Sequence, residues 1–288
     1  MQSKRVHKKR LNRSVAGDVG VTLFIVLLAL FMAFPMLYAI SNAFKPFDEM
    51  FVFPPRFFVR NPTWDNFRDL SDIVGNSWVP FSRNVFNTVF VTVAGTVFHI
   101  IFSSLAAYAL AKFDFPGRQF AFSVVVLSLM FSATVTAIPN YIIMSEFNMI
   151  DSYWALIVPP VQSSLGLYLM KQFMESLIPD SLLEAARIDG AGEMLIFRRV
   201  VMPLVRPAWM TLAILSIQSL WASTGGANIY SEELKTLPVA LNQIVAGGVA
   251  RTGAGAAVSV LMMLVPVVIF LFFQNQMIET MASSGMKE

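Results

Sequence analysis

The stretch VGVTLFIVLLALFMAFPMLYAISNAF, residues 19–44, contains no Asp, Glu, Lys or Arg. A charged side chain at the centre of a bilayer costs about 2.5–3.5 kcal/mol, and about 20 apolar residues cross the hydrocarbon core as a helix. Uncharged runs long enough to cross recur at 84–111, 119–145, 152–170, 207–231 and 252–278. The sequence therefore predicts an all-α polytopic membrane protein with six transmembrane helices.

The composition agrees with this fold class. Hydrophobic residues make up 56% of the 288 residues and charged residues 14%, against roughly 45–50% and 25% in soluble proteins. The absence of cysteine excludes a disulfide scaffold, and the net charge of +3 is too small to indicate nucleic-acid binding.

The distribution of lysine and arginine orients the six spans. Fourteen of these cations fall in the first tail (1–18), the loop between spans two and three, the loop 171–206 and the last tail (279–288), and seven fall on the other side. The positive-inside rule then places both termini in the cytoplasm. A signal peptide is the alternative reading of the first run, but the run is about twice as long as a normal h-region.

Two segments remain outside the membrane. Residues 45–83, rich in Pro, Phe and Trp, predict an ordered extracytoplasmic loop with amphipathic pieces. Residues 236–250 are uncharged but short and carry Pro238 and two glycines, so we expect a connecting loop, partly re-entrant.

The loop 171–206 is the only long cytoplasmic segment. Ser181 and Glu184 have the spacing of a capping box, which predicts a helix over 182–189 ending at Gly190 in a left-handed C′ position. A second amphipathic helix is expected over 195–202, and Pro207 suits the first turn of the fifth span. By physics alone, the loop is either a hairpin on the membrane surface or a docking element for a cytoplasmic partner.

The same loop resembles the EAA motif of ABC-importer permeases. The residues EAARIDGA at 184–191 are followed by Phe197 and by Pro203, with Val200 and Met202 where the motif has isoleucine and leucine. Further stretches resemble MalG-like permeases of carbohydrate importers, namely NVFNT at 84–88, AYALA at 107–111, FPG at 115–117, IDS at 150–152 and TLPV at 236–239. One departure is that Trp221 is followed by Ala-Ser-Thr rather than Asn-Glu-Phe.

The resemblance implies the type I ABC importer permease fold for residues 19–278, and alternating access that brings a sugar, an oligosaccharide, into the cytoplasm. It implies four kinds of partner besides membrane lipid: a second, MalF-like permease, two copies of a cytoplasmic ABC ATPase, an extracytoplasmic sugar-binding protein and the sugar itself. ATP and Mg would be bound by the ATPase, with no cofactor in this chain. The residues implied in ATPase coupling are Glu184, Ala185, Ala186, Asp189, Gly190, Ala191, Phe197 and Pro203.

Two other classes of function are alternatives for such a membrane protein: an intramembrane enzyme, and a secondary transporter or channel. An intramembrane enzyme needs a nucleophile–base pair or metal ligands, but neither H-E-x-x-H nor G-x-S-x-G occurs, no phosphate-binding loop is present, and His99 is the only histidine within a run. We therefore expect no catalytic or metal site, and a buried His99 that is hydrogen-bonded to a neighbouring helix. A secondary transporter or channel for a neutral polar solute stays open as the alternative, although ion-coupled transporters commonly carry charges within their spans.

Polar residues recur along two spans. Ser128, Ser132, Thr136 and Asn140 have the spacing of a stripe on one helix face, and a similar stripe begins at Asn84, Thr88, Thr92 and Thr96. Such stripes join helices more often than they line a pathway. For the substrate pathway the candidates are Ser132, Thr136 and Asn140 in the third run and Ser216, Ser219 and Trp221 in the fifth.

The predicted orientation can be tested in intact cells, because the chain has no background cysteine. Single cysteines at Ser14 and Ser283 should be shielded from an impermeant thiol reagent, whereas one at Thr63 should react. Labelling of either terminus from outside would contradict the six-span topology.

Overall fold

The computed structural model describes residues 15–285, and no strand occurs among them. Three helices are long: α1 (Val15–Ala43), α4 (Phe81–Lys112) and α14 (Thr252–Gly285). The medium helices are α3 (Asp65–Gly75), α5 (Arg118–Ser128), α6 (Ala133–Glu146), α7 (Trp154–Val161), α8 (Ser164–Leu177), α9 (Asp180–Ile188), α12 (Arg206–Trp221) and α13 (Leu237–Val245). Short helical segments are α2 (Phe47–Met50), α10 (Glu193–Ile196), the π-helix η1 (Phe197–Val201), α11 (Met202–Leu204) and the 3₁₀ turns η2 (Gly226–Asn228), η3 (Glu232–Leu234) and η4 (Val249–Arg251).

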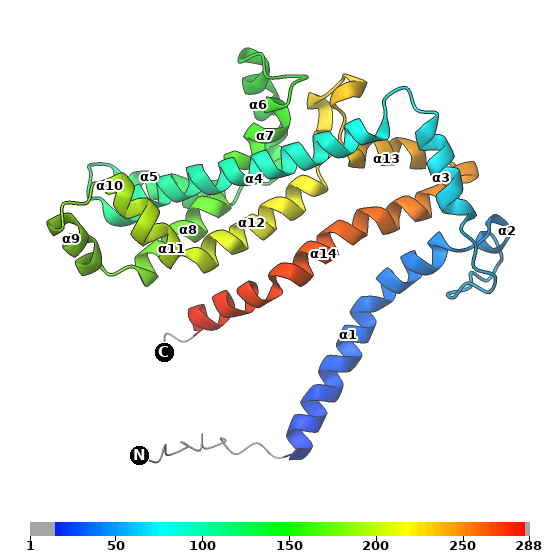
Figure 1. Ribbon diagram of the computed structural model, residues 1–288, viewed down its shortest axis with the longest axis horizontal. Helices are drawn as coiled ribbons and strands as arrows, with labels where there is room; N and C mark the ends of the chain where they lie inside the picture. The colour runs from blue at the N-terminus through cyan, green and yellow to red at the C-terminus, as the bar shows by residue number, and fades with distance from the viewer. Residues whose placement is uncertain (1–14, 286–288) are drawn as a thin grey trace.

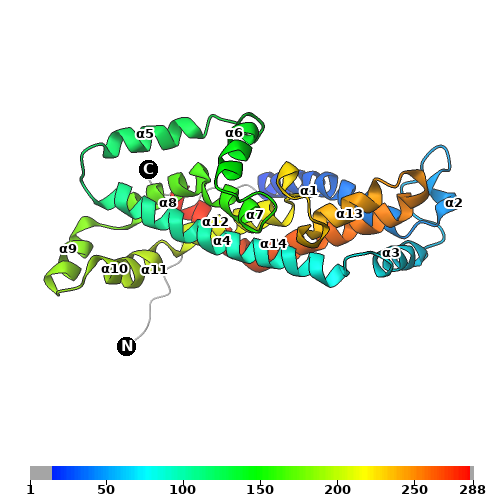
Figure 2. The same cartoon turned by 90° about the horizontal axis from the view of Figure 1, so that it is seen from above.

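The helices pack in the spatial order α5, α8, α4, α12, α14 and α1, so α4 and α12 lie at the centre (Figure 1). At one end of this assembly lie α9, α10 and α11, and at the other end α2, α3 and α13. Helix α5 packs against α8, and seen from above α6 turns away from α5 (Figure 2). The cytoplasmic loop expected from the sequence and the expected outer segments thus occupy opposite ends of the fold.

The polar face of α4 is buried. Asn87 donates from Nδ2 to the carbonyl oxygens of Glu233 and Lys235 at 2.8 and 3.0 Å, and accepts from the Tyr153 hydroxyl at 2.8 Å. The backbone N–H of Leu237 donates to Thr88 Oγ1 at 2.7 Å. Of the predicted stripe, Asn84 donates to the Lys235 carbonyl at 3.0 Å and Thr88 accepts from Leu237, so these two residues join α4 to the start of α13. The hydroxyls of Thr92 and Thr96 are buried and have no hydrogen-bond partner among the described residues.

His99 is buried where α4 meets two neighbours, as expected from the sequence. Its Nδ1 lies 2.7 Å from Ser216 Oγ on α12. On the α8 side, a Cβ at Gly166 would lie 2.3 Å from His99 Nε2, so glycine is required for this close approach. The histidine therefore fixes the contact between three helices.

Three helices satisfy the length and hydropathy needed to cross a membrane: Gly17–Ala43, Phe81–Lys112 and Val249–Gln274, and the number rises to five if each of two bent pairs is one span. The bent pairs are α5 with α6, at 115°, and Glu193–Leu204 with α12, at 79°. The run 152–170 falls on α7 and α8, and even the 14 residues of α8 rise only about 21 Å, short of the roughly 30 Å core. The count of six and the boundaries of the spans therefore stay predictions.

The third run differs from the sequence expectation of one straight helix. The chain leaves the helix after Ser128, and Ser132 has extended backbone angles before α6 begins. The β-branched Thr134, Val135 and Thr136 that follow are modest helix formers. The stripe from Ser128 to Asn140 does not lie on one helix face, and that prediction was wrong.

The fifth run also ends early, because α12 stops at Trp221. Gly225 and Gly226 have positive φ (68° and 56°), which continues the chain as a turn rather than a helix. The expected loop 236–250 contains helix α13, which has Pro238 in its first turn. Leu237, Leu241 and Ile244 have helical spacing and are buried, so the interpretation of this stretch as a loop was wrong.

Candidate functional site

Helix α9 carries the EAA residues and ends as the sequence predicts. Gly190 has φ +82°; its N–H donates to the carbonyl of Arg187, and the N–H of Ala191 donates to that of Ala186, both at 3.0 Å. This pair of hydrogen bonds is the Schellman motif, in which a left-handed residue closes the helix. The helix start differs: α9 begins at Asp180 after Pro179 and has no side-chain cap, so the predicted capping box is wrong.

The two faces of α9 have different surroundings. Leu183 is buried and Ala186 is half-buried against the hydrophobic cluster formed by α4, α8, η1 and α12. Glu184 and Ala185 are exposed, and Ile188 is 86% exposed. Ile188 and Ala185 therefore lie with the Glu184 carboxylate on the uncovered face of α9.

Two ionic contacts hold α9 in place. Lys112 at the end of α4 donates to the carbonyl of Ile178 at 2.6 Å and to Asp180 Oδ1 at 2.7 Å. The hydrogen bond from Lys112 lowers the pKa of the Asp180 carboxyl. This contact fastens the start of α9 to α4.

The second contact fastens the end of α9. Arg187 Nε donates to Glu193 Oε1 at 2.7 Å, and the Tyr108 hydroxyl donates to Glu193 Oε2 at 2.8 Å. The hydrogen bond from Arg187 lowers the pKa of the Glu193 carboxyl, outweighing its partial desolvation. One carboxylate thus connects α4, α9 and α10.

The predicted helix over 195–202 exists and is longer, running from Glu193 to Leu204 through a π-helical turn. Ile196, Phe197 and Val201 are buried, as the amphipathic pattern indicated for Phe197, whereas Pro203 is exposed. Among the other EAA residues, Asp189 is exposed and Ala191 is half-buried. The EAA residues therefore lie on two helices joined at Gly190.

The substrate-pathway candidates of the third run lie around α6. Ser132 is exposed at the start of α6, and Thr136 is half-buried. Asn140 Oδ1 accepts a hydrogen bond from Gln162 Nε2 at 3.1 Å, and both side chains line a cavity of about 190 Å³ between α6 and α7. This cavity is small, mostly apolar and equipped with two amides.

The candidates of the fifth run lie on α12 and are not brought together with those of α6 by any described contact. Ser216 is buried and bonded to His99, Trp221 is buried among α3, α13 and α14, and only Ser219 is exposed. Within the described residues, no group of three His, Asp or Glu side chains could hold a metal ion.

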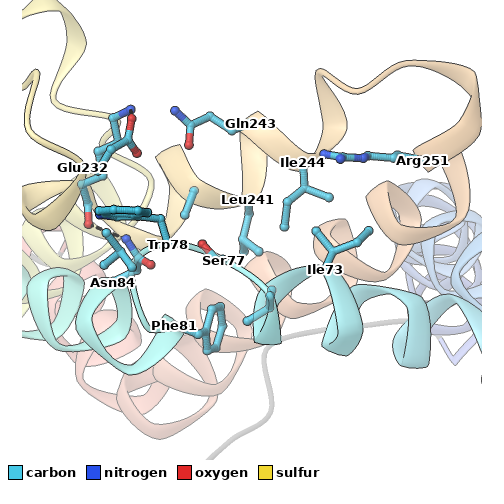
Figure 3. A pocket seen from close by; sticks show the side chains of 14 residues that line it. Ile73, Ser77, Trp78, Phe81, Asn84, Glu232, Leu241, Gln243, Ile244 and Arg251 are labelled. Carbon is cyan, nitrogen blue, oxygen red and sulfur yellow. Dashed lines mark hydrogen bonds and ion pairs between the residues drawn. The ribbon is translucent and has the colours of Figure 1, made fainter.

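A recess opens at the opposite end of the fold from α9. It has a volume of about 240 Å³ and lies between α3, the start of α4 and α13 (Figure 3). Trp78, which is 93% exposed, stands beside Glu232 and Asn84, and Gln243 and Arg251 line the other side. The recess thus combines an aromatic side chain with both hydrogen-bond donors and hydrogen-bond acceptors.

Sequence reasoning missed Tyr108, Lys112, Glu193 and the recess. Tyr108 and Glu193 are 85 residues apart in the chain, and an isolated charge or hydroxyl gives no periodic signal of its partner. The exposed Trp78 was the one visible indication, since tryptophan is common at interfaces.

Over most of its length, the chain is similar in sequence to known transport proteins. Residues 73–281 match the family model "Binding-protein-dependent transport system inner membrane component". The arabinooligosaccharides transport system permease protein AraQ of Halalkalibacterium halodurans is 29% identical over 275 residues, covering 93% of this chain and 95% of AraQ. The polygalacturonan/rhamnogalacturonan transport system permease protein YtcP of Bacillus subtilis is 32% identical, covering 79% and 78%.

A third permease and a solved transporter structure are also similar to this chain. The sn-glycerol-3-phosphate transport system permease protein UgpE of Yersinia enterocolitica is 33% identical, covering 71% of this chain and 73% of UgpE. A chain in the crystal structure of a bacterial ABC transporter involved in the import of the acidic polysaccharide alginate has the same fold, with a TM-score of 0.76 at 23% identity over 92% of this chain and 99% of that one.

The helical fold of the described residues and the match to the family model together define a transport permease. This chain belongs to the family of binding-protein-dependent transport system inner membrane components. It is a non-catalytic permease subunit of an ABC importer, and the ATPase is a separate chain. The family excludes the alternatives of an intramembrane enzyme and a secondary transporter or channel.

The position of α9 should depend on the carboxylate of Glu193. Glu193→Gln is expected to raise hydrogen exchange of the backbone amides in 180–196 at neutral pH, because a neutral amide holds Arg187 and Tyr108 less strongly. The depressed pKa means that the contact operates above the ordinary Glu value of 4.5 and is lost as the pH falls through the depressed one. Asp189→Asn is the matched control, since Asp189 is exposed and no hydrogen bond joins its side chain to the described residues; equal exchange in both variants would contradict the expectation.

Proposed function

We propose that the chain imports a sugar, an oligosaccharide, by alternating access driven by a separate ATPase, and that α9 is the coupling helix. The observation that carries this proposal is the geometry of α9: a short helix closed by a left-handed Gly190, with Glu184, Ala185 and Ile188 uncovered. Two copies of a cytoplasmic ABC ATPase, which bind ATP and Mg, are the proposed energy source. The hydrogen bonds that join α9 to α4 and α10 would transmit a force applied to α9.

The transmission follows from connectivity. Helix α9 follows α8 after one short turn and is fastened to α4 by Lys112 and by Glu193. The helix Glu193–Leu204 continues into α12. Displacement of α9 by an ATPase would therefore act on α4, α8 and α12 together, because packed interiors move as units rather than deform.

The substrate class rests on the relatives. AraQ is named for arabinooligosaccharides and YtcP for polygalacturonan and rhamnogalacturonan. We propose that Ser132, Thr136, Asn140 and Ser219 shape the wall of the sugar pathway, with Ser216 and Trp221 behind it. Hydroxyls and amides can hydrogen-bond a sugar without formal charge, and the second, MalF-like permease would complete the pathway.

The exposed surfaces of α1 and of the recess beside Trp78 suggest where the partners in the membrane and outside the cell bind. None of the most apolar stretch of α1 is buried, which fits contact with lipid and with the second permease. The recess beside Trp78 lies at the end opposite α9, so with both termini in the cytoplasm of a bacterial or archaeal cell it faces the extracytoplasmic sugar-binding protein. An exposed tryptophan is a common anchor in such interfaces.

Gly190→Val tests the coupling helix. Valine in the left-handed region costs roughly 1–2 kcal/mol, so we expect transport to fall while the chain still reaches the membrane. Gly192→Val is the matched control, because Gly192 has φ −72° and no atom near its Cβ position. Transport at the wild-type rate in Gly190→Val, at equal abundance, would contradict the assignment of α9.

Glu184→Ala separates docking from folding in the same assay. Glu184 makes no hydrogen bond with the described residues and caps no helix, but its charge acts on Arg187. A loss of transport with unchanged hydrogen exchange over residues 180–196 would therefore report a lost partner contact.

Asn140→Ala tests the pathway. Removing the amide leaves Gln162 without its partner in the cavity, so the range of sugars taken up should change while the subunits still assemble. Uptake of arabinose-containing and galacturonate-containing oligosaccharides by cells that produce the whole importer is the measurement, with the exposed Ser145→Ala on the same helix as the control. If wild type, Asn140→Ala and Ser145→Ala take up the same range of sugars, the pathway lies elsewhere.

A further inference from the structure

The chain changes direction sharply between the helix Glu193–Leu204 and α12. This helix meets α12 at 79° across a break at Val205. Since α12 is a spanning segment in the proposed topology, a helix nearly perpendicular to it lies along the membrane surface. The proposed orientation places this helix on the cytoplasmic side, where anionic lipid headgroups gather.

The side chains of this helix divide into two faces. Ile196, Phe197 and Val201 pack inward against the chain's own core. On the other side, Met194, Leu195, Arg198 and Arg199 are exposed and surround a recess of about 330 Å³. Helical spacing sets Met194 beside Arg198 and Leu195 beside Arg199, so each guanidinium stands next to an apolar side chain.

The charges of this face are uncompensated within the described residues. Arg187, Arg118, Lys112 and Lys171 each have a carboxylate partner. Arg198 and Arg199 have none among the described residues, and Glu193, on the same helix, is occupied by Arg187 and Tyr108. Two adjacent cations with exposed methionine and leucine side chains form a surface that is both positive and apolar.

We propose that Arg198 and Arg199 bind the phosphate of an anionic phospholipid of the inner leaflet, with Met194 and Leu195 against its glycerol and first acyl carbons. Arginine suits this role because its planar guanidinium pairs with phosphate through two hydrogen bonds. An amphipathic helix in the membrane surface, with arginine beside apolar side chains, has the general form of a lipid-binding helix. The bound lipid would hold the helix between α9 and α12 at a fixed depth. This inference rests on the cytoplasmic placement in the proposed function.

The test uses the full-length chain purified with its native partner subunits. Binding of fluorescently labelled phosphatidylglycerol and phosphatidylcholine is compared in wild type, Arg198→Gln/Arg199→Gln, Arg198→Lys/Arg199→Lys and the control Arg60→Gln, whose arginine is exposed at the other end of the fold. Wild type should prefer phosphatidylglycerol, and the double glutamine variant should lose about fivefold in preference per arginine. The lysine variant should keep most of it, and Arg60→Gln all of it.

Each outcome decides. Loss of the preference in the glutamine variant alone, with the ATPase still co-purifying and excess inorganic phosphate failing to displace the lipid, supports the proposal. An unchanged preference overturns it, as does displacement by inorganic phosphate, which would assign the site to free phosphate. Loss of the ATPase with the lipid preference intact also overturns it and assigns the arginines to the ATPase contact. The proposed function is tested separately by Gly190→Val, which touches neither arginine.

Discussion

Polar side chains on an apolar helix must find partners inside the protein, because the lipid offers none. In this chain the requirement falls on α4, whose buried face carries asparagines, threonines and His99. The asparagines, Thr88 and His99 find partners in the backbone from Lys235 to Leu237, in Tyr153 beside α7 and in Ser216 on α12; the Thr92 and Thr96 hydroxyls have none among the described residues. These bonds join α4 to α7, α12 and the segment before α13. The neighbouring helices are therefore arranged so that they supply hydrogen-bond partners to the polar side chains of α4.

The same helix joins the two ends of the molecule. Its first turns bind the segment leading to α13, and its last turn holds α9 through Lys112 and Tyr108. A helix of 32 residues is stiff over its length. The end proposed to face the ATPase and the end proposed to face the sugar-binding protein are thus connected by one continuous helix, α4.

Sequence reasoning was most accurate where a property repeats along the chain or belongs to one residue. Long uncharged runs indicated α1, α4 and α14, and the lone glycine after the EAA residues indicated the left-handed turn at Gly190. It failed where the deciding partner is distant: the Ser181–Glu184 cap is absent because Pro179 and the Lys112–Asp180 contact already define the start of α9. The break before Ala133 and the helix α13 were missed for a related reason, since uncharged composition marks membrane depth but not continuity. The recess beside Trp78 and the contacts of α9 with Lys112 and Glu193 form between residues that are distant in the sequence, so no single stretch of sequence predicts them.

The exposure of α1 has a consequence for how the protein is made. The chief helical neighbour of α1 is α14, which is synthesised about two hundred residues later, or about 10–40 s at usual rates of translation. During that interval α1 has no helix to pack against. It can wait in the bilayer because its backbone bonds are internal and its surface is apolar on every side. We therefore expect α1 to anchor the chain in the bilayer during synthesis, until α14 packs against it.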